Sequence, residues 1–484
     1  MPESHCVSWL PRWLGFDALE RAAVGAEDAA SAQYYGLRPK PGGWQQVGDG
    51  LRTAHAAVRT LPVSRIVQAI DETCRRWSDR QFVHRVQARH HIAATTGFSP
   101  EAIDRSLDVE LGNYRTDTLN RVLRRELGGA HVLDGFQEDI ELGGRTIAIG
   151  PRLTVAVCSG NVPGLPALSV VRALLVKSAV LLKVASGEPS FAAHFVRSLS
   201  EVDPVLADAV AVMYWSGDDH AALQDAVAQA DAVIAYGSEA ACAAVRAKVG
   251  PHQRYVEHVH KVSVGVLTQA YLGKVGLSEA ARRVAEDASA FNQHACIAPQ
   301  AYLVESGEFD VRRFAEEVAD AMAGYAAVCP LGSLRLEDAA VLQLRRASNA
   351  WAAASSPDGG FWRAPGLDWT VSLAADLLSV DGAGNRMIGL LPVADLADVV
   401  RTLRSIAPHL QNVGLGAVGV EFWELAAALG RLGASRISEP GRMASPSVIW
   451  RHDGMPCVSR LLSWCDIEMH EEARPRTTTP SDRE

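Results

Sequence analysis

From residue 153 onward the chain alternates between short apolar segments and segments with helical spacing. The segments LTVAVCS, AVLLKVAS, AVAVMYWSG and DAVIAYGS are apolar almost throughout, and helix-like stretches separate them. Strands that are apolar on both faces and joined by crossover helices are typical of a parallel sheet covered on both sides. This pattern predicts an α/β fold and constrains the chain more than any other feature of the sequence.

The same alternation resumes in the second half, in RMIGLLPV, LADVVRTLRSIA and VGLGAVGV. A chain of 484 residues is too long for one ordinary core, so two doubly wound α/β domains are expected. Residues 1–130 look mostly helical, residues 131–150 alternate and turn like a hairpin, and the polar segment 471–484 is typical of a disordered tail. The predicted division is a first domain of residues 1–130 and 151–265, then a second domain of residues 266–445.

Composition excludes several classes of function. The net charge is −9 and no long Lys/Arg run is present, which argues against nucleic-acid binding. The eight cysteines show neither a C-x-x-C pair nor a metal-ligand spacing, so we expect reduced thiols, a cytoplasmic protein and no metal site. No signal peptide is recognisable, and the most apolar stretch is broken by Arg172, Lys177 and Lys183, so no membrane span is expected.

Chemically useful residues follow two of the predicted strands. Ligands of α/β sheets bind at the carboxyl ends of the strands. The first strand leads into CSGNVPG, in which Asn161 supplies an amide, and DAVIAYGS ends at Gly237 and Ser238. A helix that begins after Gly-Ser offers free N–H groups to a phosphate, although the G-x-G-x-x-G fingerprint is missing. Each of these elements taken alone is more often structural.

Cys296 lies in FNQHACIAPQ, between a helix-like and a strand-like segment. A free cysteine is more often a small buried side chain than a nucleophile. The order of the motifs around Cys296 nevertheless favours the nucleophile over the buried structural cysteine. CSGNVPG, LLKVASGEP, IAYGSEA and NQHACIAPQ resemble, in that order, the aldehyde dehydrogenase superfamily. SGNVPG, EHVHKVS and the ending AC-x-x-PQ resemble its LuxC branch, the acyl-CoA or fatty acid reductases.

The resemblance covers about residues 150–450 and implies an aldehyde dehydrogenase-like fold. It places Cys296 at the nucleophile and Asn161 at the side-chain donor to the oxyanion. Glu257 lies near the glutamate that activates water in hydrolytic members, and His260 and His294 are candidates for tuning the thiol. Because the thiolate is the nucleophile, we expect a helix end or a cationic nicotinamide to help ionise Cys296.

The resemblance also implies a nicotinamide cofactor. Lys183 falls at the lysine that holds the adenosine ribose, and Gly237 and Ser238 match the turn beside the pyrophosphate. Ser186 stands where NAD-preferring members often carry a glutamate, so the sequence predicts NADPH, with NADH possible. In the superfamily a hairpin and a C-terminal strand mediate association, so residues 131–150 and 446–468 suggest a homodimer or homotetramer.

The predicted function is therefore an acyl-thioester reductase. It would convert an acyl-CoA or carrier-bound acyl group, in particular a fatty one, to an aldehyde with NADPH through an acyl-enzyme. The alternative is an NAD(P)-dependent aldehyde dehydrogenase that oxidises an aldehyde to the acid, for which Glu257 is the only support. The predicted strand RMIGLLPV lacks the acidic residue that usually contacts the nicotinamide ribose, which favours the reductase. A non-catalytic subunit is the third possibility.

Overall fold

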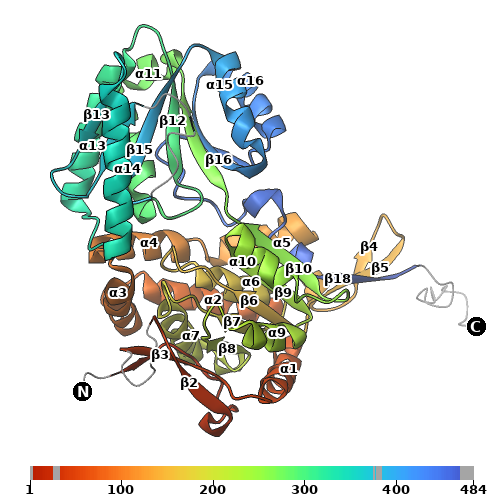
Figure 1. The fold of residues 1–484 in the computed structure, drawn as a ribbon. Helices are drawn as coiled ribbons and strands as arrows, with labels where there is room; N and C mark the ends of the chain where they lie inside the picture. Colours follow the sequence, from red (N-terminus) through yellow and green to blue (C-terminus); the bar gives the residue numbers. More distant parts are fainter. Residues whose placement is uncertain (1–3, 26–32, 374–376, 378–383, 469–484) are drawn as a thin grey trace, which may run out of the picture.

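The computed structural model describes residues 4–25, 33–373, 377 and 384–468. Figure 1 shows two lobes, each built around its own sheet, with a small sheet projecting from the side of the lower lobe. The predicted tail 471–484 lies outside the described residues. Among the helices of the described ranges, none has the length and apolar character needed to cross a membrane.

The lower lobe contains a parallel five-stranded sheet in the order β10-β9-β6-β7-β8. The chain places β7 and β8 on one side of β6 and then returns to place β9 and β10 on the other. The topological switch point therefore lies at the end of β6, where the Asn161 loop begins, and this is where ligands of open α/β sheets bind. The strands are β6 (Leu153–Val157), β7 (Ala179–Lys183), β8 (Val210–Met213), β9 (Ala232–Gly237) and β10 (Arg254–Val259). The helices are α6 (Pro166–Leu175), α7 (Phe191–Val202), α8 (Pro204–Ala207), α9 (His220–Ala228) and α10 (Glu239–Arg246).

The upper lobe contains a seven-stranded sheet in the order β13-β14-β15-β12-β11-β16-β17, parallel except for the β13–β14 pair. The chain passes from the lower to the upper sheet between β10 and β11, so residue 265, the expected domain boundary, lies inside β11. The strands are β11 (Val262–Leu267), β12 (Pro299–Glu305), β13 (Phe361–Arg363), β14 (Thr370–Leu373), β15 (Met387–Val393), β16 (Leu410–Gly416) and β17 (Arg436–Ser438). The helices are α11 (Gln269–Val275), α12 (Leu277–Ser289), α13 (Val311–Val328), α14 (Leu336–Ala354), α15 (Leu396–Leu403) and α16 (Gly419–Leu432).

The N-terminal region is helical, as expected, but it also contains a small sheet. Its helices are α1 (Trp44–Thr60), α2 (Val63–Trp77), α3 (Val83–Thr96), α4 (Pro100–Gly112) and α5 (Thr116–Leu127), and its strands are β1 (His5–Cys6), β2 (Leu19–Ala23) and β3 (Tyr34–Pro39). Trp9 and Val212 exchange backbone hydrogen bonds, so this segment extends the edge of the lower sheet beside β8. The strands β2 and β3 pair antiparallel and β1 pairs with β3, so the N-terminal segments form this sheet among themselves.

The predicted hairpin is present as β4 (Gln137–Asp139) and β5 (Gly144–Ile149). The strand β18 (Ser463–Ile467) pairs antiparallel with β5, and Figure 1 shows this sheet at the side of the lower lobe. Of the expected strand 446–468, however, only β18 is extended and paired. The residues before it form loops and 3-10 turns, because several of their side chains face the cavity described next.

Candidate active site

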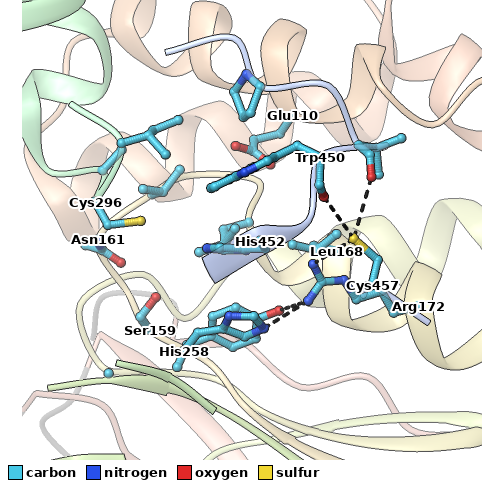
Figure 2. A pocket seen from close by; sticks show the side chains of 18 of the residues that line it. Glu110, Ser159, Asn161, Leu168, Arg172, His258, Cys296, Trp450, His452 and Cys457 are labelled. Atoms are coloured by element: carbon cyan, nitrogen blue, oxygen red, sulfur yellow. Dashed lines mark hydrogen bonds between the residues drawn. The ribbon is translucent and has the colours of Figure 1, made fainter. Parts of the chain in front are cut away.

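A cavity of about 450 Å³ brings together residues of both lobes. Its walls come from the end of α4, the loop after β6, helix α6, the ends of β9 and β10, the Cys296 loop and the segment 446–457. Figure 2 shows Cys296 and Asn161 on one side of this cavity, with Trp450, His452 and Leu168 extending away from them toward Arg172. The cavity therefore contains both residues expected at the centre of catalysis.

The loop before Cys296 has an unusual backbone. Phe291, Asn292 and Gln293 are three successive non-glycine residues with positive φ angles of 52°, 51° and 64°. Such left-handed residues persist only where side-chain contacts compensate the strain. The Asn292 amide donates to the Leu331 carbonyl and its oxygen accepts from Arg386.

The Gln293 amide donates to the carbonyls of Pro299 and Met387, and its oxygen accepts from the Met387 N–H. The motif FNQ thus fixes a tight turn that presents Cys296.

Cys296 itself is anchored to the upper sheet through its backbone. Ser263 of β11 donates to the Cys296 carbonyl at 2.7 Å. Burial, followed by the negative charge of Asp453, raises the pKa of the Cys296 thiol to about 12, although a hydrogen bond with the Gln411 side chain opposes this shift. The charge of Glu110 raises the pKa further. The surrounding protein groups by themselves therefore favour the protonated thiol.

Asn161 reaches the Cys296 loop directly. Its amide donates a hydrogen bond of 2.7 Å to the carbonyl of His294, two residues before the cysteine. This bond joins the switch-point loop of the lower lobe to the nucleophile loop of the upper lobe. The structure thus places the two predicted catalytic residues at one site, with the Asn161 amide group beside the sulfur (Figure 2).

The predicted cofactor residues follow the strands β7 and β9. Gly237 and Ser238 line the cavity, and the Ser238 hydroxyl caps α10 by accepting from the Ala241 N–H. A side chain at Gly160 would be impossible without a shift, because its Cβ would lie 2.7 Å from the Glu188 nitrogen. The glycine therefore allows the β6 and β7 loops to remain in close contact.

Lys183 and Ser186 lie outside the cavity lining, beyond these loops. Lys183 is buried at the end of β7, and burial lowers the pKa of its ammonium. Within the described ranges no hydrogen bond or ion pair of this ammonium is present, so its donors are available to ribose hydroxyls. Ser186 is exposed. The residues present are compatible with a nicotinamide dinucleotide, whose adenosine ribose Lys183 would hold.

Glu257 does not face the cavity. Successive residues of a strand point to opposite faces, and in β10 it is His258 that lines the cavity. Glu257 instead forms an ion pair with Arg246 of α10. Glu257 therefore does not lie where a residue could activate water beside Cys296. The sequence analysis did not identify His258, because strand register decides which of two neighbouring residues faces the site.

The two candidate histidines also differ in position. His260 lines the cavity, whereas the His294 ring hydrogen-bonds with Asn385 at 2.9 Å and packs against Phe98. His294 therefore contributes its backbone carbonyl to the site, but its ring points elsewhere.

A buried polar network forms one wall of the cavity. Asp453 accepts from the Gln411 amide at 2.6 Å and from His258 Nδ1 at 2.7 Å. On the other side of the same ring, Arg172 donates to His258 Nε2 at 3.1 Å and to the Tyr236 hydroxyl at 3.0 Å. Since Arg172 donates to Nε2, His258 is neutral and its proton lies on Nδ1.

This network does not fit a metal ion. His258, His452 and Asp453 place possible ligand atoms within 4.8 Å of one another. However, the two imidazole rings are stacked, with centroids 4.3 Å apart and planes inclined by 29°, so their lone pairs do not converge. The Arg172 guanidinium beside His258 would also repel a cation. The stack continues through Trp450 and Tyr236, and it makes a rigid aromatic wall.

Glu110, in the last turn of α4, is the other residue that the sequence did not reveal. It lines the cavity, and burial raises the pKa of its carboxyl to about 7. The sequence of α4 has the pattern of an ordinary amphipathic helix. Glu110 reaches the site only because α4 packs against the nucleophile loop.

Comparison with known proteins agrees with this architecture. Residues 58–464 match the family model described as acyl-CoA reductase (LuxC). The chain belongs to the LuxC family. Over 443 residues this LuxC protein is 24% identical to the long-chain acyl-protein thioester reductase 2 of Photobacterium leiognathi, covering 87% of the chain and 85% of that relative.

Solved structures show the same fold as this LuxC protein. An NAD-dependent benzaldehyde dehydrogenase from Corynebacterium glutamicum superposes with a TM-score of 0.69 at 14% identity, covering 93% of the chain and 95% of that structure. An NADP-dependent enzyme of E. coli superposes with a TM-score of 0.70 at 13% identity, with the same coverage of both chains. The aldehyde dehydrogenase-like α/β fold expected from the sequence is confirmed.

Proposed function

We propose that this LuxC protein reduces an acyl thioester to an aldehyde through an acyl-enzyme on Cys296, with NADPH as the hydride donor. The observation that carries the proposal is the hydrogen bond of Asn161 to the nucleophile loop, in a cavity that also reaches the Gly237–Ser238 turn. Family membership and the name of the Photobacterium relative support the reaction class.

Each step assigns a role to a residue of the chain. Cys296 attacks the thioester carbonyl, and the Asn161 amide and the Cys296 N–H stabilise the oxyanion that forms. The thiol of the donor leaves, and the acyl group stays on Cys296. NADPH, when bound, would supply the hydride to the acyl carbon. The bond between this carbon and the Cys296 sulfur then breaks, which releases the aldehyde and regenerates the cysteine. The apolar walls, including Val162, Leu165 and Leu168, hold the acyl chain and exclude water.

The choice of NADPH depends on Ser186. A glutamate at this position would repel a 2′-phosphate, and the exposed serine carries no charge. Lys183, whose ammonium has no partner in the described part of the chain, would hold the adenosine ribose. Replacing Ser186 by Glu is expected to weaken NADPH binding more than NADH binding, and fluorescence titration with each cofactor measures this.

Acyl-CoA and a carrier-bound acyl group share the thioester that Cys296 attacks. The relative's name specifies an acyl-protein donor, whereas the family description specifies acyl-CoA. The proposal therefore commits to the thioester, and a direct comparison of acyl-CoA with an acylated carrier protein identifies the better donor.

Hydrolytic oxidation of aldehydes receives no support from the site. Its only sequence support was Glu257, which is paired with Arg246 away from the cavity. A reductase gains from this arrangement, because a carboxylate at the position where hydrolytic relatives activate water would promote hydrolysis of the acyl-enzyme, and Glu257 does not occupy it.

The decisive experiment is transfer of a radiolabelled acyl group from acyl-CoA to the protein. Label is expected on wild-type Cys296 and absent in Cys296→Ala, and Asn161→Ala is expected to slow aldehyde formation about 10²- to 10³-fold. An unlabelled wild type, or equal labelling of Cys296→Ala, would refute the acyl-enzyme. Normal turnover of Asn161→Ala would remove its role as oxyanion donor.

The assembly and the compartment belong to the same proposal. The sheet of β4, β5 and β18 exposes Ile140, Ile149 and Trp464, which suits association into a homodimer or homotetramer. All eight cysteines are free, which suits the reducing cytoplasm. Analytical ultracentrifugation of the wild type and a Trp464→Glu variant tests the role of this sheet in assembly.

A further inference from the structure

Glu110 is held against the two loops that carry the proposed catalytic residues. A Cβ at Gly164 would lie 3.1 Å from Glu110 Cβ and 3.3 Å from its Cγ, so the side chain passes directly over the loop of Asn161. The preceding residue, Val109, packs into the apolar cluster that includes Cys296 and Val162. Figure 2 shows Glu110, Trp450 and Cys296 around the same cavity.

The carboxyl of Glu110 has no hydrogen bond or ion pair within the described ranges of the chain. Burial raises its pKa to about 7, and its place in the last turn of α4 acts in the same direction, because the negative end of the helix dipole disfavours a carboxylate. A group that titrates near neutral pH can both accept and donate a proton during turnover.

The chemistry at Cys296 requires such a group. With a thiol pKa of about 12, only on the order of one sulfur in 10⁵ is ionised at neutral pH. His258 cannot take this proton, because its Nε2 accepts from Arg172 and its Nδ1 bonds to Asp453. Among the carboxylates, Asp453 is bonded within the network and Glu257 faces away from the cavity.

We propose that Glu110 is the general base that takes the proton from the Cys296 thiol and the general acid that returns it to the leaving thiol of the acyl donor. This role rests on the proposed function. The sulfur of Cys296 forms a bond to the acyl carbon as its proton passes to the Glu110 carboxylate. The bond between the acyl carbon and the donor sulfur then breaks, and Glu110 protonates that sulfur. The carboxylate is regenerated, and no other reactant is needed.

Other titratable groups face the same cavity. Burial raises the pKa of Tyr114 and, to about 12, that of Tyr236. Burial lowers the pKa of His258 and, to about 3, that of His452. Arg172, Cys457 and His260 also line the cavity, and Asp453 lies behind His258, to which it is hydrogen-bonded. The variant His260→Gln therefore serves as the control for Glu110.

The test is the rate at which Cys296 takes label from a radiolabelled fatty acyl-CoA without nicotinamide cofactor, from about pH 5.5 to about pH 9. In the wild type the rate is expected to rise with pH and to level off above an apparent pKa near 7. Glu110→Gln is expected to lower the rate about 10²- to 10⁴-fold and to remove this inflection. Glu110→Asp should restore part of the rate, and His260→Gln should keep the inflection.

Two results would refute the role of Glu110 without refuting the reductase assignment. The first is wild-type kinetics in Glu110→Gln. The second is an inflection that is lost in His260→Gln but retained in Glu110→Gln. Circular dichroism and cofactor titration of each variant establish that the fold and the dinucleotide site are intact. A wild type that takes no label at any pH would instead refute the reductase assignment, and the role of Glu110 with it.

Discussion

The two polar regions of the cavity differ in how completely their groups are bonded. Asp453 binds both His258 and Gln411, and Arg172 binds the other side of the same imidazole. Glu110, across the cavity, has no such partner in the described part of the chain. Although burial opposes it, hydrogen bonding to His258 holds the pKa of Asp453 at about 2, whereas burial raises that of Glu110 to about 7.

This difference separates a structural from a reactive carboxyl. A fully bonded network fixes the protonation state and the orientation of its members. An isolated carboxyl in an apolar wall costs stability when it is ionised, but it can exchange protons at neutral pH. The comparison predicts that changes in the Asp453 network destabilise the fold, whereas changes at Glu110 slow the chemistry and alter stability only where the carboxylate would be ionised.

The largest effect on stability is expected from Asp453→Ala. The side chain is only 6% exposed, and its loss leaves the buried His258 and Gln411 without their acceptor. Each buried donor left without an acceptor typically costs about 1–3 kcal/mol, and urea unfolding at neutral pH measures the combined loss for the two donors. Because the pKa of Asp453 is lowered, this stabilisation is present above its ordinary value of 3.8 and disappears as the pH falls toward 2. A loss below about 1 kcal/mol would show that the network is dispensable.

A smaller effect, of opposite sign, is expected from Glu110→Gln. The folded protein keeps this proton between pH 4.5 and about 7, while the unfolded chain releases it, so the ionised carboxylate destabilises the fold as the pH rises. At pH 8 the variant should therefore be more stable than the wild type by on the order of 2–3 kcal/mol. Near pH 4 the two proteins should unfold alike. Paired thermal or urea unfolding at both pH values measures the difference, and equal stability at pH 8 would mean that the carboxyl is solvated.

The smallest effect is expected from Glu257→Gln, on the outer face of β10. Its partner Arg246 is 60% exposed, and pairs of this kind contribute about 0.2–1 kcal/mol. Aldehyde formation and acyl transfer should stay within about twofold of the wild type. A large loss of acyl transfer, with the fold intact, would show that Glu257 takes part in the reaction even though it lies on the other face of β10.

Much of the fold could be predicted from the sequence. The apolar runs that became β6, β7 and β9 are buried on both faces, and such a pattern has few solutions other than a parallel sheet. The start of α4 also carries a local signal, because Ser99 precedes Pro100 and its hydroxyl accepts from the Ala102 N–H. The N-terminal strands, which pair with one another in a separate sheet, were missed.

The candidate site was predictable only where a motif keeps its residues within a short segment. Asn161 and Cys296 belong to recognisable loops, and the structure brings these loops together. The sequence analysis singled out Glu257, whereas the adjacent residue His258 lines the cavity. The two side chains project from opposite faces of β10, and the sequence does not show which face meets the site. Glu110 and Asp453 carry no local signal at all.

By itself, then, the sequence determined the kind of sheet, the order of the motifs and the identity of the nucleophile candidate. These follow from hydrophobic spacing and from loops whose residues are close along the chain. Only the tertiary structure decided which carboxyls and histidines share the cavity with Cys296, and in which protonation states. Those properties depend on burial and on partners hundreds of residues away, and neither is encoded in local spacing.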